Sequence, residues 1–260
     1  GLVIIMKLTI LHTNNIILNS NNHYSLIDEI KERNKKTAEE TLFLGATDIN
    51  FSKSNYQNDE KNFLKKLKYD AIAIGEHQFD EGSQGLAKFL KQLDFPVLAA
   101  NVQIEKDEIL NTFEKNGKFL PYLLKESKFG KIGIFGLTPM STVYDSCPSS
   151  DTIFTNPSDR TEFIVKMLKK KEANLIILLS QLGQDENQIL AQKFPEIDVI
   201  IDRATYKTDK TINKWKKTLM VQTMADFPSI FELELEVDEQ GKLLTAQEKY
   251  HEVFESVNYG

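Results

Sequence analysis

The sequence of 260 residues contains a single cysteine, Cys147, which excludes an internal disulfide framework. It contains no apolar run near the roughly 18 residues that a membrane-spanning helix needs. Basic residues are not in excess, because the net charge is −6 and the pI is about 5.4. The chain therefore lacks the electrostatic footprint of a nucleic-acid-binding protein. What remains is a chain with 41% hydrophobic residues, enough for a substantial core.

The first residues are apolar but lack the basic start and the small-residue cleavage site of a signal peptide. This favours a cytoplasmic location unless an export signal has been removed, since the sequence begins with Gly1 rather than Met. The location stays open on these grounds.

Apolar β-rich runs alternate with helical spacing through the first hundred residues. The alternation β-α-β-α-β-α-β favours parallel strands joined by crossover helices. The strands are expected at 7–12, 41–46, 70–75 and 95–102, and the helices at 24–35, 58–68 and 86–93. Further on, we expect a hairpin formed by residues 119–128 and 131–138. Helices are expected from Asn156-Pro157 to residue 171 and at 185–194. Strands are expected at 174–180, 197–201, 218–223, 229–237 and 243–250. The lysines at 214–217 are interpreted as part of a solvated helix face. With no internal repeat and no linker composition, residues 1–260 are predicted to form a single domain.

Polar and acidic side chains follow one of these strands directly. The stretch from Tyr69 to Gly82 reads YDAIAIGEHQFDEG, with Glu76, His77 and Asp80 after the apolar run. Open α/β sheets build sites where buried strands deliver such groups to their carboxyl ends. The alternative is a strand followed by a solvated turn, and the stretch alone does not decide between the two.

The order of the motifs resembles the 5'-nucleotidase and UDP-sugar hydrolase branch of the calcineurin-like metallophosphoesterases. LTILHTNNII is similar to the family's LTILHTNDIH, YDAIAIGEHQFDEG to YDAMTLGNHEFDYG, and LSQLG with IDVIIDRATY to LSHLG with IDVIIGGHSH. FPVLAANV and GKIGIFGLTP match nearly as written. The resemblance covers almost the full length and implies an α/β fold, a four-layer αββα sandwich of two mixed β-sheets flanked by helices.

The family hydrolyses phosphate esters with two divalent metals about 3.5–4 Å apart. The resemblance places Asp48 and Glu76 at metal-ligand positions, together with Asn15 and Gln181, which replace an aspartate and a histidine. The remaining histidine positions hold side chains that are poor ligands or none at all: Ile17, Ala204 and Tyr206. Carboxylate and amide oxygens suit Mg²⁺ or Ca²⁺ better than zinc. We therefore expect no cofactor, or at most one weakly bound Mg²⁺ or Ca²⁺ ion.

The resemblance also implies roles outside the metal set. His77 stands at the place of the family's catalytic histidine, Asp80 at that of the residue orienting it, and Asn101 is a candidate substrate-binding residue. A His–Asp pair can hold a tautomer and donate a proton. The alternative is a vestigial pair that only holds the loop. Arg203 is a candidate counter-charge for Asp48 or Glu76, because buried carboxylates without one are costly.

The sequence thus predicts a degenerate 5'-nucleotidase-like domain, a catalytically inactive pseudoenzyme that acts by binding. A small anion or nucleotide in the former active-site cleft, or a protein partner, would be its ligand, with no nucleic acid and no membrane span. The alternative is a residual metal-dependent phosphohydrolase acting on nucleotides or other phosphate esters. The family's C-terminal nucleotide-binding domain is expected to be absent, because the sequence ends soon after the last predicted hairpin.

Overall fold

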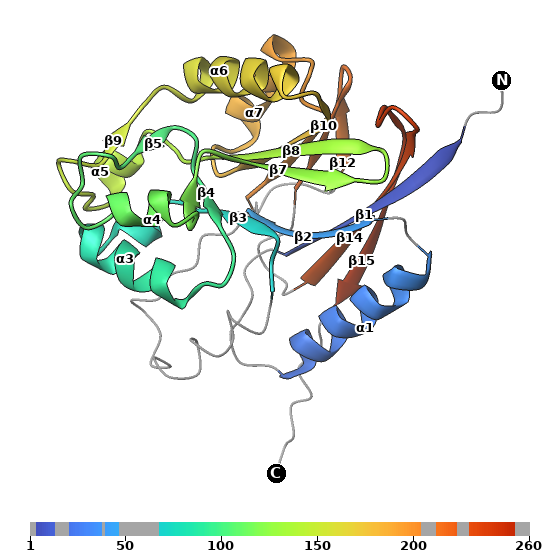
Figure 1. The fold of residues 1–260 in the computed structure, drawn as a ribbon, viewed down its shortest axis with the longest axis horizontal. Helices are drawn as coiled ribbons and strands as arrows, with labels where there is room; N and C mark the ends of the chain where they lie inside the picture. Colours follow the sequence, from blue (N-terminus) through green and yellow to red (C-terminus); the bar gives the residue numbers. More distant parts are fainter. Residues whose placement is uncertain are drawn as a thin grey trace.

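The computed structural model describes residues 4–13, 21–37, 40–46, 68–203, 212–222 and 229–252, and Figure 1 shows their arrangement. Two mixed β-sheets lie face to face and helices cover the outer face of each, so the predicted α/β fold with two mixed sheets flanked by helices is confirmed. Every structural statement below concerns these residues.

The first sheet has the strand order β15-β14-β1-β2-β3-β4-β6. Its strands are β1 (Ile5–Thr13), β2 (Glu40–Ala46), β3 (Ala71–Ala73), β4 (Val97–Leu98), β6 (Phe119–Leu120), β14 (Ser229–Asp238) and β15 (Leu243–Glu252). The pairs β1-β2, β2-β3 and β3-β4 are parallel, as the alternating pattern predicts, and the C-terminal hairpin β14-β15 adds on antiparallel to β1.

The second sheet has the strand order β12-β13-β11-β10-β8-β7. Its strands are β7 (Tyr122–Ser127), β8 (Gly130–Leu137), β10 (Ala173–Ser180), β11 (Val199–Asp202), β12 (Ile212–Trp215) and β13 (Thr218–Val221). Strands β8, β10, β11 and β13 run parallel, so their carboxyl ends lie at one edge of the sheet. A further small sheet pairs β5 (Val102–Gln103) with β9 (Ile153–Phe154).

The helices are α1 (Asn21–Thr37), η1 (His77–Phe79), α3 (Gly82–Gln92), α4 (Asn111–Lys115), α5 (Thr142–Asp145), α6 (Pro157–Lys170) and α7 (Gln184–Lys193). The apolar faces of α1 and α3 cover the first sheet, and those of α6 and α7 cover the second, as Figure 1 shows on opposite sides. The start of α6 is as predicted, because the Asn156 side chain accepts hydrogen bonds from the N–H groups of Ser158 and Asp159.

Three apolar cores result from strands that are buried on both faces. On β10, Leu175, Ile177 and Leu179 point into the core between the two sheets. Ile176 and Leu178, one residue out of phase, point into the core under α6 and α7. The third core lies between the first sheet and the helices α1 and α3. This accounts for the continuous apolar run in the sequence of β10.

Two predicted strands are divided in the structure. Residues 95–102 form β4 and the start of β5, because the backbone N–H of Ala100 leaves the first sheet and donates to the carbonyl oxygen of Gly136 on β8. Residues 119–128 form β6 in the first sheet and β7 in the second, with Pro121, which has no N–H group, at the change of sheet.

The helical interpretation of residues 214–217 is wrong. Strand β12 ends at Trp215 and pairs antiparallel with β13, which begins at Thr218. Lys216 has a φ of 53°, which places it in the tight turn between these strands. The predicted helix at 58–68 lies outside the described residues except for its last position.

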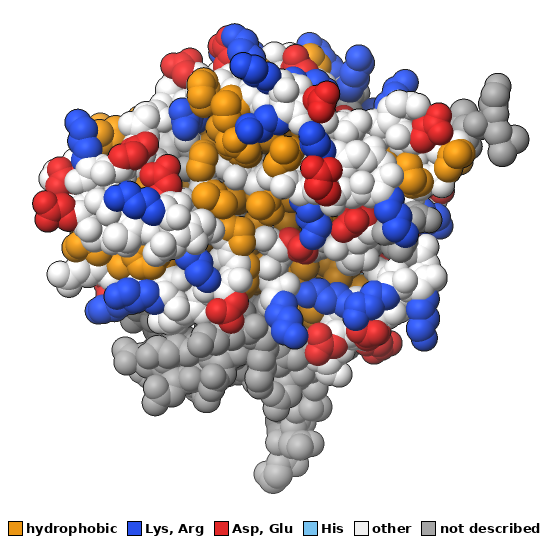
Figure 2. Space-filling model, viewed as in Figure 1, with side chains coloured by type: hydrophobic (Ala, Val, Ile, Leu, Met, Phe, Trp, Pro, Cys, Tyr) orange, Lys and Arg blue, Asp and Glu red, His pale blue; other side chains and the backbone are white. Residues whose placement is uncertain are grey.

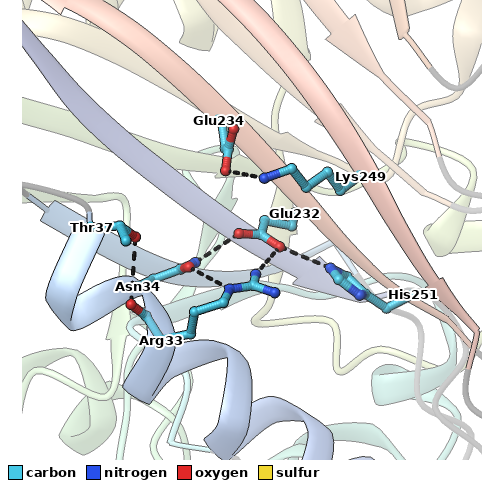
Figure 3. A network of polar contacts seen from close by, with 7 residues as sticks. All are labelled: Arg33, Asn34, Thr37, Glu232, Glu234, Lys249 and His251. Carbon is cyan, nitrogen blue, oxygen red and sulfur yellow. Dashed lines mark hydrogen bonds and ion pairs between the residues drawn. The ribbon is translucent and has the colours of Figure 1, made fainter.

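A buried carboxylate fastens α1 to the first sheet. The side chain of Glu232 on β14 has no solvent exposure. It accepts hydrogen bonds from Arg33, from the amide of Asn34 at 2.9 Å and from the ring of His251 on β15 at 2.8 Å (Figure 3). Burial by itself raises the pKa of Glu232, but these hydrogen bonds outweigh it and hold the pKa below its usual range.

The surface mixes both signs of charge. Figure 2 shows acidic and basic side chains interspersed over one face, with apolar side chains gathered between them near its centre. No described helix has the length and apolar character required to cross a bilayer.

Candidate active site

The loop after β3 holds the His77 and Asp80 side chains against each other. His77 Nδ1 lies 3.0 Å from Asp80 Oδ2, and the two side chains are 38% and 31% exposed. Residues His77–Phe79 form the 3₁₀ turn η1, which the Asp80 N–H closes by donating to the His77 carbonyl oxygen. Side chains three residues apart eclipse each other in a 3₁₀ turn, which is why this pair meets.

Two buried side chains, Gln78 and Phe79, hold the same turn against the core. Phe79 is 1% exposed and packs edge-on against Phe154, with ring centroids 5.1 Å apart. The Gln78 side chain is buried and accepts a hydrogen bond of 3.1 Å from the N–H of Gly75. With these two side chains inside, Glu76 and His77 lie partly exposed at the end of the strand.

A third side chain reaches Asp80 from a distant segment. The Ser146 hydroxyl, at the end of α5, donates to Asp80 Oδ1 at 2.9 Å. Each oxygen of the Asp80 carboxylate therefore contacts a different partner, one from its own turn and one 66 residues away in sequence.

The carboxyl ends of β3 and β8 are joined across the two sheets. The Thr138 hydroxyl, one residue beyond β8, donates to the carbonyl oxygen of Ile74 at 3.0 Å. The amide of Asn101 accepts from the Thr138 N–H at 2.9 Å and donates to the Thr138 carbonyl oxygen at 2.8 Å. The side chain of Asn101 therefore bonds to backbone groups and holds the end of β8 in place.

Gln181 lies at the next strand end of the second sheet. The backbone N–H of Gln181 donates to the Leu137 carbonyl oxygen at 3.1 Å. Gln181 therefore lies next to the end of β8, where Thr138 follows. The Gln181 side chain is buried at 1% exposure, and its amide nitrogen has no hydrogen-bond partner in the structure as described. A buried amide donor without an acceptor costs about 1–3 kcal/mol.

A second buried acid lies at the same edge. Asp202 ends β11, and its carboxylate accepts hydrogen bonds from the Gln222 amide at 2.8 Å and from the Arg203 N–H at 2.9 Å. Burial raises the pKa of Asp202, and these hydrogen bonds work against that rise. The second sheet thus ends in a buried row of polar side chains rather than in the histidines of the resembled motif.

Comparison with known proteins connects this arrangement to a family. The chain is 40% identical over 131 residues to the NAD 5'-nucleotidase of Haemophilus influenzae, a match covering 50% of this chain and 21% of that protein. It is 25% identical over 286 residues to human 5'-nucleotidase, covering 92% and 48%. The crystal structure of a 5'-nucleotidase precursor from Thermus thermophilus superposes with a TM-score of 0.77 at 26% identity, over 95% of this chain and 55% of that one. The chain is homologous to the 5'-nucleotidases.

The homology is to the N-terminal calcineurin-like metallophosphoesterase domain of the 5'-nucleotidase family and covers most of the chain. No family model matches the sequence. The chain spans less than half the length of the two curated relatives, at 48% and 21%.

The metal-ligand positions of the 5'-nucleotidase family are only partly described. Glu76 lies three residues after the end of β3, and Gln181 directly follows β10. Asn15, Ile17, Asp48, Ala204 and Tyr206 lie outside the described residues. Among the residues that are described, no three or more His, Cys, Asp or Glu side chains form a group that could hold a metal ion. The predicted metal set, the catalytic roles of His77 and Asp80 and the substrate-binding role of Asn101 therefore stay predictions.

Arg203 lies near the start of α7. Its guanidinium nitrogen is 3.7 Å from the position that a Cβ on Gly183 would occupy. Its charge works against the rise that burial causes in the pKa of Glu186. A role as counter-charge to Glu76 or Asp48 stays a prediction, with Asp48 outside the described residues.

Sequence reasoning missed Ser146, Thr138, Asp202 and Gln222. Asp202 carried a signal, because an acid replaces the first glycine of the family's GGHSH motif directly after an apolar strand. Ser146, Thr138 and Gln222 carried none, because their partners are 66, 64 and 20 residues away in sequence, respectively.

Proposed function

We propose that this domain of the 5'-nucleotidase family binds a phosphate-bearing small molecule, nucleotides included, at the carboxyl edge of its two sheets, and that it does not hydrolyse it. The observation that carries the proposal is the Gln181 amide, whose nitrogen is buried without an acceptor among the described residues, where the resemblance expects a metal-binding histidine. An amide N–H bonds directly to a phosphate oxygen, whereas it cannot coordinate a cation.

The residues at the resembled metal positions do not suit a two-metal centre. Hydrocarbon side chains such as Ile17 and Ala204 cannot coordinate, and the amide oxygen of Gln181 is a weak substitute for imidazole. Loss of a single supporting group already lowers metal affinity about 10–100-fold. The chemistry that a metal pair supplies, a polarised phosphate and a hydroxide at neutral pH, therefore has no support in this donor set.

Calorimetric titration with AMP and with inorganic phosphate, in the presence of EDTA, tests the proposal. We expect saturable binding, weakened about 10–100-fold by Gln181→Leu, which keeps the side-chain size but removes the donor. Gln184→Leu, an exposed glutamine at the start of α7, is the matched control and leaves the affinity unchanged. Equal binding by the wild type and Gln181→Leu would show that the amide has no part in recognition.

The second candidate is a residual metal-dependent phosphohydrolase, which the contact between His77 and Asp80 favours. Asp48 and Glu76 would hold one Mg²⁺ or Ca²⁺ ion, which would neutralise phosphate charge when bound. His77 would protonate the leaving oxygen.

Release of phosphate from a panel of nucleotides, measured with added Mg²⁺, Ca²⁺, Mn²⁺ or Zn²⁺ at about 1 mM substrate, distinguishes the two candidates. Turnover that is lost both with EDTA and in His77→Ala would establish the hydrolase. Absence of turnover together with EDTA-resistant binding supports the binding domain. Absence of both would reject both candidates.

A further inference from the structure

Ser146 belongs to a segment that packs at two points against the stretch from the His77 turn to the start of α3. Its hydroxyl donates to Asp80 Oδ1 at 2.9 Å, and its own N–H closes α5 by donating to the Thr142 carbonyl oxygen at 3.1 Å. The carbonyl oxygen of the next residue, Cys147, lies 3.3 Å from the position that a Cβ on Gly82 would take. Gly82 has a φ of +63°, a conformation that glycine adopts without strain.

The geometry at Asp80 shows what the Ser146 contact does. A hydrogen bond at each oxygen of a carboxylate restricts its rotation about the Cβ–Cγ bond more than a single hydrogen bond does. Asp80 Oδ2 faces His77 Nδ1 at 3.0 Å, and Oδ1 receives the Ser146 hydroxyl. The His77–Asp80 pair is about one-third exposed, and exposed ion pairs of this kind contribute only about 0–1 kcal/mol by themselves. The Ser146 hydroxyl therefore adds a restraint on Asp80 that the pair does not supply by itself.

We propose that Ser146 is a positioning residue which, through Asp80, fixes the imidazole of His77 with its hydrogen on Nδ1. In a neutral imidazole, one nitrogen carries the hydrogen and the other carries the lone pair. Donation from Nδ1 to Asp80 makes Nε2 the nitrogen with the lone pair. The relay Ser146–Asp80–His77 is thus a structural property of the free protein, and only its use in ligand recognition rests on the proposed function.

The tautomer is measurable without any ligand. Two-bond ¹H–¹⁵N spectra of the imidazole rings, recorded about two pH units above the ordinary histidine pKa of about 6.5, distinguish the two neutral forms. The chain contains 4 histidines, and His77→Gln identifies the signal of His77 by its loss. We expect His77 in the wild type to be mainly the Nδ1–H tautomer and Asp80→Ala to remove that preference.

The pair Ser146→Thr and Ser146→Val isolates the hydroxyl, because the two side chains have nearly the same shape. Threonine should retain the wild-type tautomer ratio, and valine should lower the Nδ1–H fraction relative to Nε2–H by about threefold or more. Ser141→Ala, at the exposed start of the same helix and without a side-chain cap hydrogen bond, is the control and should match the wild type.

Two results would overturn the proposal. Equal tautomer ratios in Ser146→Thr and Ser146→Val would show that the hydroxyl does not position the ring. A wild type that is mainly Nε2–H would show that the relay itself is not formed. Failure of AMP to bind, with the tautomer behaving as expected, would instead reject the proposed function and leave the role of Ser146 intact.

Discussion

The hydroxyl of Thr138 donates a hydrogen bond of 3.0 Å to the carbonyl oxygen of Ile74, and this bond joins the two sheets beside the candidate site. Thr138 has no solvent exposure, and the Asn101 amide pairs with both its N–H and its carbonyl group. Three residues from three segments therefore set where the His77 loop begins relative to the end of β8.

Asn101 is expected to act on stability as well as on the site. Asn101→Ala leaves the buried N–H and carbonyl groups of Thr138 without partners, so the free energy of unfolding should fall by about 2–4 kcal/mol. Urea denaturation measures this fall. Asn116→Ala, at an exposed helix end, is the control and should change stability by less than about 0.5 kcal/mol. Normal stability combined with lost AMP affinity would assign Asn101 to ligand binding instead.

The buried carboxylate of Glu232 should contribute more to the free energy of unfolding than that of Glu234, which lies on the same strand. Glu232→Ala leaves the Asn34 amide and the Arg33 guanidinium without their acceptor, and we expect a loss of about 2–4 kcal/mol. The matched control is Glu234→Ala, whose carboxylate is 30% exposed and pairs with Lys249, with an expected loss of at most about 1 kcal/mol (Figure 3). Because the pKa of Glu232 is lowered in the folded state, its contribution is present above the ordinary carboxyl pKa of 4.5 and is lost as the pH falls through the folded value. Equal losses for the two variants would contradict the burial argument.

His12 should make the fold sensitive to mild acid. It is fully buried, stacks on Phe231 with ring centroids 5.1 Å apart, and neither ring nitrogen has a hydrogen-bond partner in the described structure. Burial lowers the pKa of His12 from 6.5 to about 3.

The unfolded chain therefore binds a proton at His12 that the folded chain does not bind between pH 6.5 and about 3. Stability is full above pH 6.5 and falls as the pH drops through this window, by up to about 1.4 kcal/mol per pH unit from this group. His12→Leu should flatten that dependence in urea titrations at several pH values. An identical slope in the two proteins would show that His12 does not titrate in this way.

Asp198 should give stability a pH dependence opposite to that from His12. Burial raises its pKa from 3.8 to about 6, against the hydrogen bond that its carboxylate accepts from the Ile176 N–H at 2.8 Å. The folded state therefore retains a proton that the unfolded state loses, and stability falls as the pH rises through this window.

Asp198→Asn should stabilise the protein at neutral pH, by at most about 3 kcal/mol, and the gain should vanish below pH 3.8. Thermal unfolding at both pH values measures it, with the exposed Asp94→Asn as a neutral control. A gain that persisted in acid would need another cause.

Local pattern accounts for the elements that were predicted correctly. The apolar run at 174–180 became β10, and Asn156-Pro157 starts α6, because each depends on residues that are neighbours in sequence. The same reasoning joined β4 to β5 and β6 to β7, since the choice between two sheets is made by partners elsewhere in the chain. Strand β12 was missed because its lysines suggested a solvated helix face, whereas pairing with β13 decides its conformation.

For the candidate site, the sequence by itself indicated the resemblance to the 5'-nucleotidases, the loop with Glu76, His77 and Asp80, and the strand end that carries Gln181, because these are carried by contiguous motifs. Only the tertiary structure decided that Ser146 holds Asp80, that Thr138 joins Ile74, and that Asp202 is buried against Gln222. The physical reason is the separation along the sequence of the residues that interact. Spacing along the chain fixes which side chains share a turn or a strand, whereas hydrogen bonds between distant segments form only after the sheets and helices have packed around their cores.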